Sequence, residues 1–413
     1  MDDRIQFGRR VAHWRNRRRL TQLEFAALMQ HSVRWVEELE AGRRQADPNI
    51  SVATEIARRL GITLERLLHD PAVLCTAGSE IDAVRRALQR HDVITGRCDN
   101  SAADPVPVAA LQRDLWLART GFQAGHFAQL GVQIPRLLVD ATRAAERHQG
   151  DDQLEAYRQL SLTLELTEAA AIKWGDTELA VVAGHRAVAA AERSGDPVIQ
   201  ASAARHLADA MTNHGQAAAA VAFVTAAARR LQPDLLGRGP EGLSVLGMLF
   251  LKAAMAQAAA AEADDHSPAR HARSATGFLD EADEHAGRLG FDGNELWTSF
   301  GPTNCKLYRV AAHVQLSEGA DAVAVATGIP ATALAGLPRE RRAHLLTDRA
   351  HGEKQAGLRA QAVTTLLEAE EEAPEEVLCR PRTRQLVEDL RLLGTGAAEG
   401  RLRALADRCG LPG

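Results

Sequence analysis

The chain has 413 residues and a formal net charge of −5, and 25% of its residues are charged. This length exceeds one ordinary domain and predicts two or more. The five cysteines are scattered without a CxxC spacing, which argues against a disulfide framework or a zinc site. They are Cys75, Cys98, Cys305, Cys379 and Cys409.

Charge is distributed unevenly along the chain. Residues 1–70 carry 13 arginines and no lysine against 10 acidic residues, whereas the remainder carries 36 basic and 44 acidic residues. This asymmetry suits a basic, DNA-facing region attached to a body that does not itself bind nucleic acid. The most apolar stretch, 243–261, is interrupted by Lys252 and Gln257 and predicts a buried helix rather than a membrane span. With no signal peptide at its charged N-terminus, the chain is expected to be cytoplasmic, with no membrane partner.

Residues 21–42 predict two short helices joined by a tight turn. Thr21 and Glu24 form a capping-box pair, in which each side chain satisfies a backbone donor at a helix start. Ser32 is a good N-cap for the second helix, whose Val36 and Leu39 fall three apart on its inward face. A helix held in this way can present its N-terminal turn to the major groove of DNA.

Residues 7–68 resemble the lambda-repressor-like helix-turn-helix of the Xre family of bacterial regulators. The residues that match at the family's spacings are Arg15, Leu20, Thr21, Gln22, Ala26, Ser32, Val36, Leu39, Glu40 and Gly42. The resemblance implies a compact five-helix domain, a phosphate contact by Gln22 and an ion pair between Arg15 and Glu40. The turn departs from the family pattern because Gln30 stands where glycine is usual, and a left-handed residue there costs about 1 kcal/mol.

The residues that follow the cap of the second helix carry chemistry for reading bases. Arg34 can bind guanine O6 and N7 in a bidentate manner, Val33 can pack on a thymine methyl group and Glu38 can accept from cytosine N4. Arg43 and Arg44 are placed to bind phosphates. Trp35 either flanks the DNA backbone or packs on the edge of the domain, and packing is the favoured alternative. The predicted DNA-binding residues are Gln22, Ser32, Val33, Arg34, Trp35, Glu38, Arg43 and Arg44.

Three regions are expected: a DNA-binding domain over residues 1–70, a linker over 71–107 and a helical-repeat domain over 108–413. The linker contains one predicted helix at 79–93. This helix is either a dimerisation element or the first capping helix of the repeats, and both alternatives stay open.

Residues 108–413 are rich in Ala, Leu, Glu and Arg, with apolar residues three and four apart, so helices are expected nearly throughout. The spacing Gly-x4-Ala-x6-Ala starts at Gly175, Gly215, Gly319 and Gly357. In each match the glycine is expected to close one helix, and the small residues to let the next helix pack tightly. The pattern resembles tetratricopeptide repeats, with an undifferentiated α-solenoid as the alternative. The predicted fold class is therefore all-α.

A helix-turn-helix followed by such repeats resembles the peptide-pheromone-sensing regulators, in which a ligand in the concave groove reorients paired DNA-binding domains. An asparagine in that groove often clamps the ligand backbone. The resemblance makes Asn304, with Tyr308 and Arg309 on the same expected helix and Trp297 upstream, the candidate effector site. A purely structural alternative is favoured, because Asn304 follows Gly-Pro-Thr at a natural helix start and aromatic residues there commonly belong to the core.

No nucleophile elbow, P-loop or dinucleotide-binding glycine pattern occurs, and His266 and His271 do not share a helical face. No enzyme activity, cofactor or metal site is therefore expected. The sequence predicts a homodimeric transcriptional regulator that binds palindromic double-stranded DNA and responds to a peptide or small-molecule effector. The alternative is a tetratricopeptide-type interaction scaffold with an auxiliary helix-turn-helix.

Overall fold

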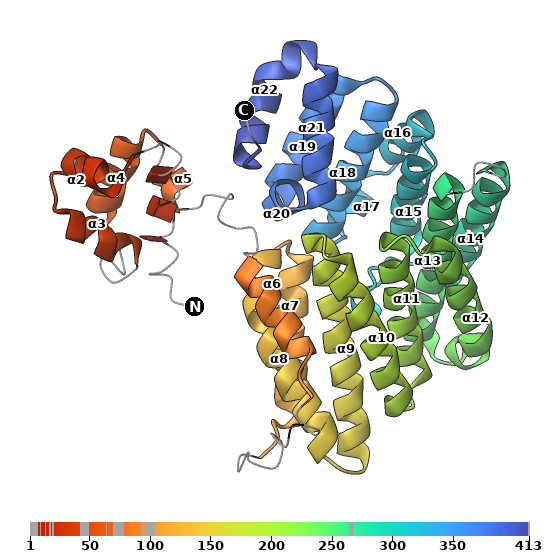
Figure 1. Ribbon diagram of the computed structural model, residues 1–413. Helices are drawn as coiled ribbons and strands as arrows, with labels where there is room; N and C mark the ends of the chain where they lie inside the picture. Colours follow the sequence, from red (N-terminus) through yellow and green to blue (C-terminus); the bar gives the residue numbers. More distant parts are fainter. Residues whose placement is uncertain are drawn as a thin grey trace. The chain divides into compact units, whose positions relative to one another are not determined.

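The computed structural model describes residues 7–8, 10–12, 14–15, 18, 20–41, 49–62, 64–68, 78–91, 95, 104–263 and 268–411. Within these residues every regular element is a helix and none is a strand, which confirms the all-α prediction. The chain divides into two compact units, Met1–Cys75 and Thr76–Gly413 (Figure 1).

Short helices make up the described part of the first unit: α2 (Gln22–Met29), α3 (Val33–Glu40), α4 (Ile50–Leu60) and α5 (Leu64–Leu68). The predicted capping box sets the start of α2. The Glu24 carboxylate accepts from the Thr21 backbone N–H at 2.7 Å, and the Thr21 hydroxyl accepts from the Glu24 N–H at 3.2 Å. Helix α4 ends at Gly61, whose φ of 62° is the left-handed conformation that glycine adopts without steric cost.

One apolar core holds these short helices together. Val36 and Leu39 of α3 are fully buried, as their spacing predicted. The other buried members are Phe7, Val11, Trp14, Phe25, Ala26, Met29, Trp35, Ala53, Ile56, Ala57, Leu60 and Leu67. Because packing uses one face of α3, its opposite face is left to solvent.

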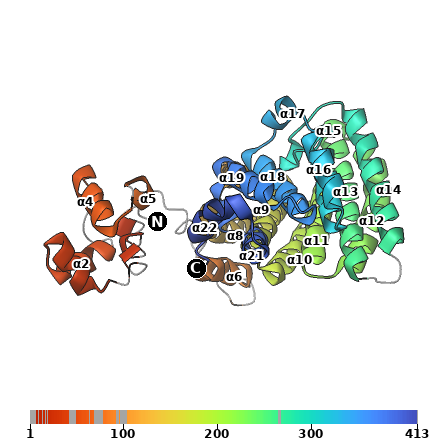
Figure 2. The same ribbon diagram turned by 90° about the horizontal axis from the view of Figure 1, so that it is seen from above.

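The second unit is a curved stack in which consecutive helices pack on one another (Figure 2). Its helices are α6 (Gly78–Leu88), α7 (Val108–Gln123), α8 (Phe127–Arg147), α9 (Asp151–Trp174), α10 (Thr177–Ser194), α11 (Pro197–Asn213), α12 (Ala217–Leu236), α13 (Gly239–Ala263), α14 (Pro268–Leu289), α15 (Pro302–Gln315), α16 (Gly319–Thr327), α17 (Ala331–Ala335), α18 (Arg339–Gln355), α19 (Arg359–Glu372), α20 (Pro374–Leu378), α21 (Pro381–Leu393) and α22 (Glu399–Arg408). Two 3-10 turns, η2 (Glu295–Trp297) and η3 (Gly396–Ala398), lie among them.

Helix α6 packs on α8, and its Arg85 pairs with Asp176 at 2.5 Å, so α6 is part of this stack.

The small-residue spacing coincides with helix junctions at three of its four matches. There, a glycine with positive φ follows one helix and a fully buried alanine lies in the next: Gly175 and Ala180, Gly215 and Ala220, Gly357 and Ala362. The match at Gly319 differs, because this glycine begins α16 instead of ending a helix. Burial in α16 falls on Ala322 and Ala326, while Ala324 is exposed.

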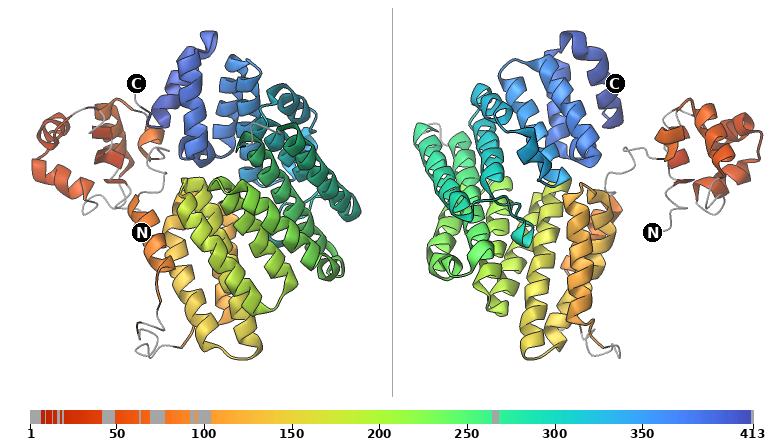
Figure 3. Two further views of the ribbon diagram at one scale, coloured as in Figure 1. Left: turned by 45° about the vertical axis from the view of Figure 1, so that its right-hand side comes forward. Right: turned by 180° about the vertical axis from the view of Figure 1, so that it is seen from behind.

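The stack bends back on itself, so that α18 and α20 pack against α7 to α9 (Figure 3). We call this contact the closure seam. The ammonium of Lys173, near the end of α9, lies between the carboxylates of Glu340 on α18 and Glu376 on α20, at 2.6 and 2.7 Å. None of these three side chains is more than 6% exposed. Burial acts to raise the pKa of Glu340, but Arg341 and Lys173 outweigh it and hold that pKa well below its usual range. The carboxylate is therefore charged, and it pairs with Lys173 across the seam.

A second contact across the closure seam involves Glu375 of α20. Its carboxylate accepts from the backbone N–H of Ala128, in the first turn of α8, at 2.8 Å. A negative charge is favourable at a helix N-terminus, where backbone donors are unpaired. Burial nevertheless raises the pKa of Glu375 to about 7, against the opposing effect of the Ala128 and Phe127 donors.

Helix α13 contains the apolar stretch noted in the sequence. Among the described residues, Gly239–Glu262 is the segment long and apolar enough to cross a membrane, with a mean hydropathy of 1.6, and 67% of it is buried inside the unit. It packs against α11, α12, α14 and α15. Packing within the unit therefore accounts for its composition.

The cysteine spacing argued against a disulfide framework, and among the described cysteines Cys379 is nevertheless disulfide-bonded. Cys305 and Cys409 are free and buried. Pairing depends on which cysteines the fold brings together, and distant pairs leave no spacing signal in the sequence.

Replacing Lys173 with methionine should destabilise the second unit by about 3 kcal/mol, because Glu340 and Glu376 lose a shared buried cation. The matched control is Lys354→Met, since Lys354 pairs with Asp389 at a partly exposed site and should cost less than about 1 kcal/mol. Urea unfolding of the two variants measures both values. Equal losses would show that the closure seam does not depend on Lys173.

The raised pKa of Glu375 predicts a pH-dependent contribution to stability. The folded protein binds this proton more tightly than the unfolded chain, whose carboxyl has a pKa near 4.5, so the contribution falls as pH rises toward 7. Relative to wild type, Glu375→Gln should therefore gain roughly 2–3 kcal/mol of stability between about pH 5 and pH 8. Urea unfolding at the two pH values tests this, and parallel pH dependences in wild type and variant would contradict it.

Candidate functional site

The α2–α3 junction presents one helix N-terminus to solvent. Gln30 takes the left-handed conformation, with φ of 56° and ψ of 38°, at the turn position where the family pattern has glycine. Ser32 then caps α3, because its hydroxyl accepts from the Trp35 backbone N–H at 3.2 Å. Both features were predicted from the sequence, and together they fix the direction in which α3 leaves the turn.

The outward face of α3 carries the residues with base-reading chemistry. The Arg34 side chain is 84% exposed and pairs with Glu38, one turn on, at 3.0 Å. Val33 is partly exposed at the first position of the helix. Exposed ion pairs of this kind contribute little free energy, so the guanidinium can leave Glu38 for another partner at small cost.

Two other predicted DNA-binding residues of the first unit are held by its own side chains. Trp35 is only 6% exposed and stacks on His31 with ring centroids 4.1 Å apart, so it belongs to the core rather than to the outward face. The Gln22 amide donates to Glu40 at 2.9 Å. Glu40 also binds Arg15 at 2.6 Å, which is the ion pair that the resemblance implied. Arg43 and Arg44 lie outside the described residues.

A second candidate site lies inside the second unit, where a partly open cavity of about 170 Å³ is lined by alternate helices of the stack, α7, α9, α11, α13 and α15, and by α18 and α21. Its lining is strongly charged. Three carboxylates line it, those of Asp209, Glu340 and Asp348. Seven basic side chains line it: Arg119, Lys173, Arg205, Lys252, Arg341, Arg380 and Arg382. Cations therefore outnumber anions on the wall, and the site favours a negatively charged occupant.

Most of the basic side chains on this wall already have a carboxylate partner. Lys252 binds Asp209 at 2.8 Å, and Arg341 binds Glu340 at 3.0 Å. The remaining pairs are Lys173 with Glu340 and Glu376, Arg380 with Glu376, and Arg119 with Glu165. Among the described residues, none lies within hydrogen-bond or ion-pair distance of the Arg205 guanidinium.

Burial shifts the pKa values of the titratable groups behind the cavity wall. Burial raises the pKa of Glu165, and it raises that of Glu168 well above its usual range. Burial, together with Arg205 and Arg119, holds the pKa of His206 well below its ordinary value, so His206 is neutral. Its Nδ1 lies 2.5 Å from Glu168. Burial therefore acts against negative charge on the two carboxylates and against positive charge on His206.

A strained segment brings an aromatic ring to the cavity. Leu296, Trp297 and Ser299 have φ angles of 47°, 56° and 49°, a region that non-glycine residues rarely adopt. The Asn294 side chain holds the segment, since its Oδ1 accepts from the Ser299 backbone N–H at 3.1 Å. The Trp297 ring faces the Arg119 guanidinium at 5.1 Å. Strain of this kind persists only where surrounding contacts enforce it, and it clusters at ligand-binding positions.

The predicted effector residues occupy different places in this unit. Trp297 and Tyr308 line the cavity. Asn304 is fully buried, and its amide donates to the backbone carbonyl of Thr298 at 3.4 Å, so it contacts the strained segment rather than the cavity. Arg309 binds Asp280 and Asp283 of α14 at 3.0 and 2.7 Å and is not part of the cavity wall.

Sequence reasoning missed the charged residues of the inner helices, although a signal for them exists. In α11, Arg205, His206 and Asp209 interrupt an alanine-rich helix. In α9, Glu165 and Glu168 lie among leucines in the same way. Charged residues inside a helix buried on all sides are rarely tolerated without a partner or a ligand.

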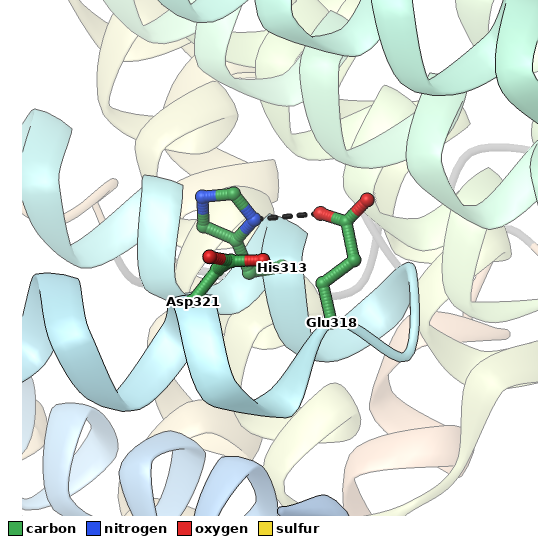
Figure 4. Close-up of side chains that lie close together, drawn as sticks. All are labelled: His313, Glu318 and Asp321. Atoms are coloured by element: carbon green, nitrogen blue, oxygen red, sulfur yellow. Dashed lines mark hydrogen bonds and ion pairs between the residues drawn. The ribbon is translucent and has the colours of Figure 1, made fainter.

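Two groups of side chains have metal-ligand geometry among the described residues. His313, Glu318 and Asp321 lie at the junction of α15 and α16, where His313 Nδ1 is 2.7 Å from Glu318 (Figure 4). Two of these three are exposed acids in or beside the first turn of α16, where carboxylates are favourable without a metal.

The other group is Glu340, His344 and Glu376. Lys173 Nζ already lies within 3.3 Å of all three. The ammonium therefore takes the position that a metal ion would need.

No protein-family model matches the chain, and no curated protein matches it. The function is therefore argued from the geometry of the two candidate sites.

Proposed function

We propose that this protein is a sequence-specific DNA-binding transcriptional regulator. The observation that carries the proposal is the outward face of α3, where Arg34 is 84% exposed at the capped start of a helix whose other face is buried. This arrangement matches the geometry by which the second helix of a helix-turn-helix reads base edges in the major groove. The same proposal holds that the first unit is a helix-turn-helix domain similar to that of lambda repressor.

The second unit is proposed to dimerise and to sense an effector. A single recognition helix contacts few base pairs, so two copies on a palindromic operator are needed for useful specificity. The helix pairs of the second unit, which we relate to tetratricopeptide repeats, line a charged cavity of about 170 Å³. The closure seam favours a small molecule over an extended peptide, because it closes the stack where an open groove was expected.

Arg34→Ala should weaken binding to the preferred sequence by about 1–3 kcal/mol and relax specificity at one base position. The preferred sequence is first obtained by selection from a random duplex pool with wild-type protein, and affinities then follow from fluorescence anisotropy at fixed salt. Arg136→Ala is the matched control, since Arg136 is 80% exposed and pairs with Asp140 four residues on, as Arg34 pairs with Glu38.

Two outcomes of this experiment contradict the proposal. If the selection enriches no sequence, the protein does not read bases, and an interaction scaffold with an auxiliary helix-turn-helix becomes the better description. If Arg34→Ala loses affinity equally for selected and scrambled duplexes, Arg34 contacts phosphate only.

A further inference from the structure

Arg205 is the most unusual charged group of the second unit. It is 5% exposed, it lies on the cavity wall, and its Nε is buried without a hydrogen-bond partner. A buried charge without a partner is strongly destabilising, because desolvation is not offset. The nearest acids do little to offset it, since Glu165 already accepts from Ser202 at 2.8 Å and its pKa is raised by burial. A bound anion that is not part of the chain would therefore neutralise the Arg205 charge.

Two of the other guanidinium groups on the cavity wall can join Arg205 in binding an anion. Arg382, on α21, is exposed there, and no described residue lies within ion-pair distance of it. Arg341, on α18, must share Glu340 with Lys173. Guanidinium groups bind carboxylates and phosphates through paired N–H donors. The three arginines come from an early helix, α11, and from two late helices, so an anion among them would tie the two sides of the closed stack together.

The volume of the cavity and the aromatic residues on its wall limit the kind of ligand that it can hold. About 170 Å³ is close to the roughly 150 Å³ cavity that holds one benzene molecule. Trp297 and Tyr308 supply flat apolar surface beside the arginines. This volume suits a compact molecule with one ring, whereas an extended peptide needs far more room.

We propose that this cavity binds a small organic anion, whose carboxylate or phosphate is held by Arg205 with Arg341 and Arg382, and whose ring packs on Trp297. Binding itself is independent of DNA. That the anion acts as the effector rests on the proposed regulatory function.

The test uses the full-length protein and three probes at constant ionic strength: benzoate, phenyl phosphate, and benzamide as the uncharged match of benzoate. Calorimetry and thermal unfolding should show that at least one anion binds and raises the unfolding temperature, while benzamide does neither. The two anions distinguish a carboxylate site from a phosphate site. No response to either anion, or an equal response to benzamide, overturns the proposal.

Arg205→Met separates a ligand site from a structural role. The variant should unfold at a higher temperature than wild type without ligand, because an unpaired buried charge is removed, and it should bind the anion at least about tenfold more weakly. A lower unfolding temperature together with unchanged anion affinity would overturn the proposal. Arg382→Gln, at an exposed position, should weaken binding without changing the stability of the unliganded protein, and Arg136→Gln should change neither.

Anisotropy with the selected duplex then tests the regulatory role separately. A change in DNA affinity on adding the anion, absent in Arg205→Met, supports the effector role. Anion binding without any change in DNA affinity removes that role and leaves the binding site intact. Failure of sequence selection, in contrast, contradicts only the DNA-binding function.

Discussion

The architecture of the second unit depends on one buried cation, Lys173, held between Glu340 and Glu376. The residues it joins are 167 and 203 positions away in the chain, and all three are almost completely buried. A buried ion pair of this kind adds little net stability over an apolar alternative, but it penalises any arrangement in which one partner is left alone. The pairing therefore acts mainly as a specificity device: helices α18 and α20 must close onto α9, because any other packing strands a charge. A solenoid without this constraint would present an open concave surface.

Closure changes the environment of the inner helices. Side chains that would face solvent in an open groove, such as Arg205, instead line a small cavity that is partly shielded from water. Unpaired charge is costly there. Buried carboxylates with a basic partner, such as Glu340, stay charged. Glu168 and His206 can lose their charge, and burial shifts their pKa values in that direction. Arginines cannot, because the guanidinium stays protonated even when burial lowers the pKa of Arg119 to about 10. The wall consequently keeps an excess of positive charge.

The first unit is stabilised by different interactions from those of the second unit. Its core is small and almost entirely apolar, and its polar contacts include short-range caps and a shielded ion pair between Arg15 and Glu40. Such a unit is stabilised by burying one face of each helix, which leaves the other face of α3 exposed to solvent. Arg34 and Glu38 neutralise each other on that face at little energetic cost.

Most of the features that could be predicted from the sequence depend on residues that are only a few positions apart in the chain. The Thr21–Glu24 capping box, the Ser32 cap and the burial of Val36 and Leu39 follow from residues three or four positions apart, and the resemblance implied the left-handed turn at Gln30; the structure has each of them. The helical class and the glycine junctions are local in the same sense. Their energetics are set by backbone geometry, which neighbouring residues determine.

The closure seam, the cavity and the different burial pattern of α16 were decided only by the tertiary structure. Lys173, Glu340 and Glu376 carry no mutual spacing that a sequence can reveal, and Arg205 becomes unusual only once its helix is buried on all sides. The disulfide of Cys379 belongs to the same class. The sequence alone determined the helical class and the caps of α2 and α3, since those terms are local. Which distant charges meet was decided by the complete fold, because a pair's energy depends on the burial that only the folded chain supplies.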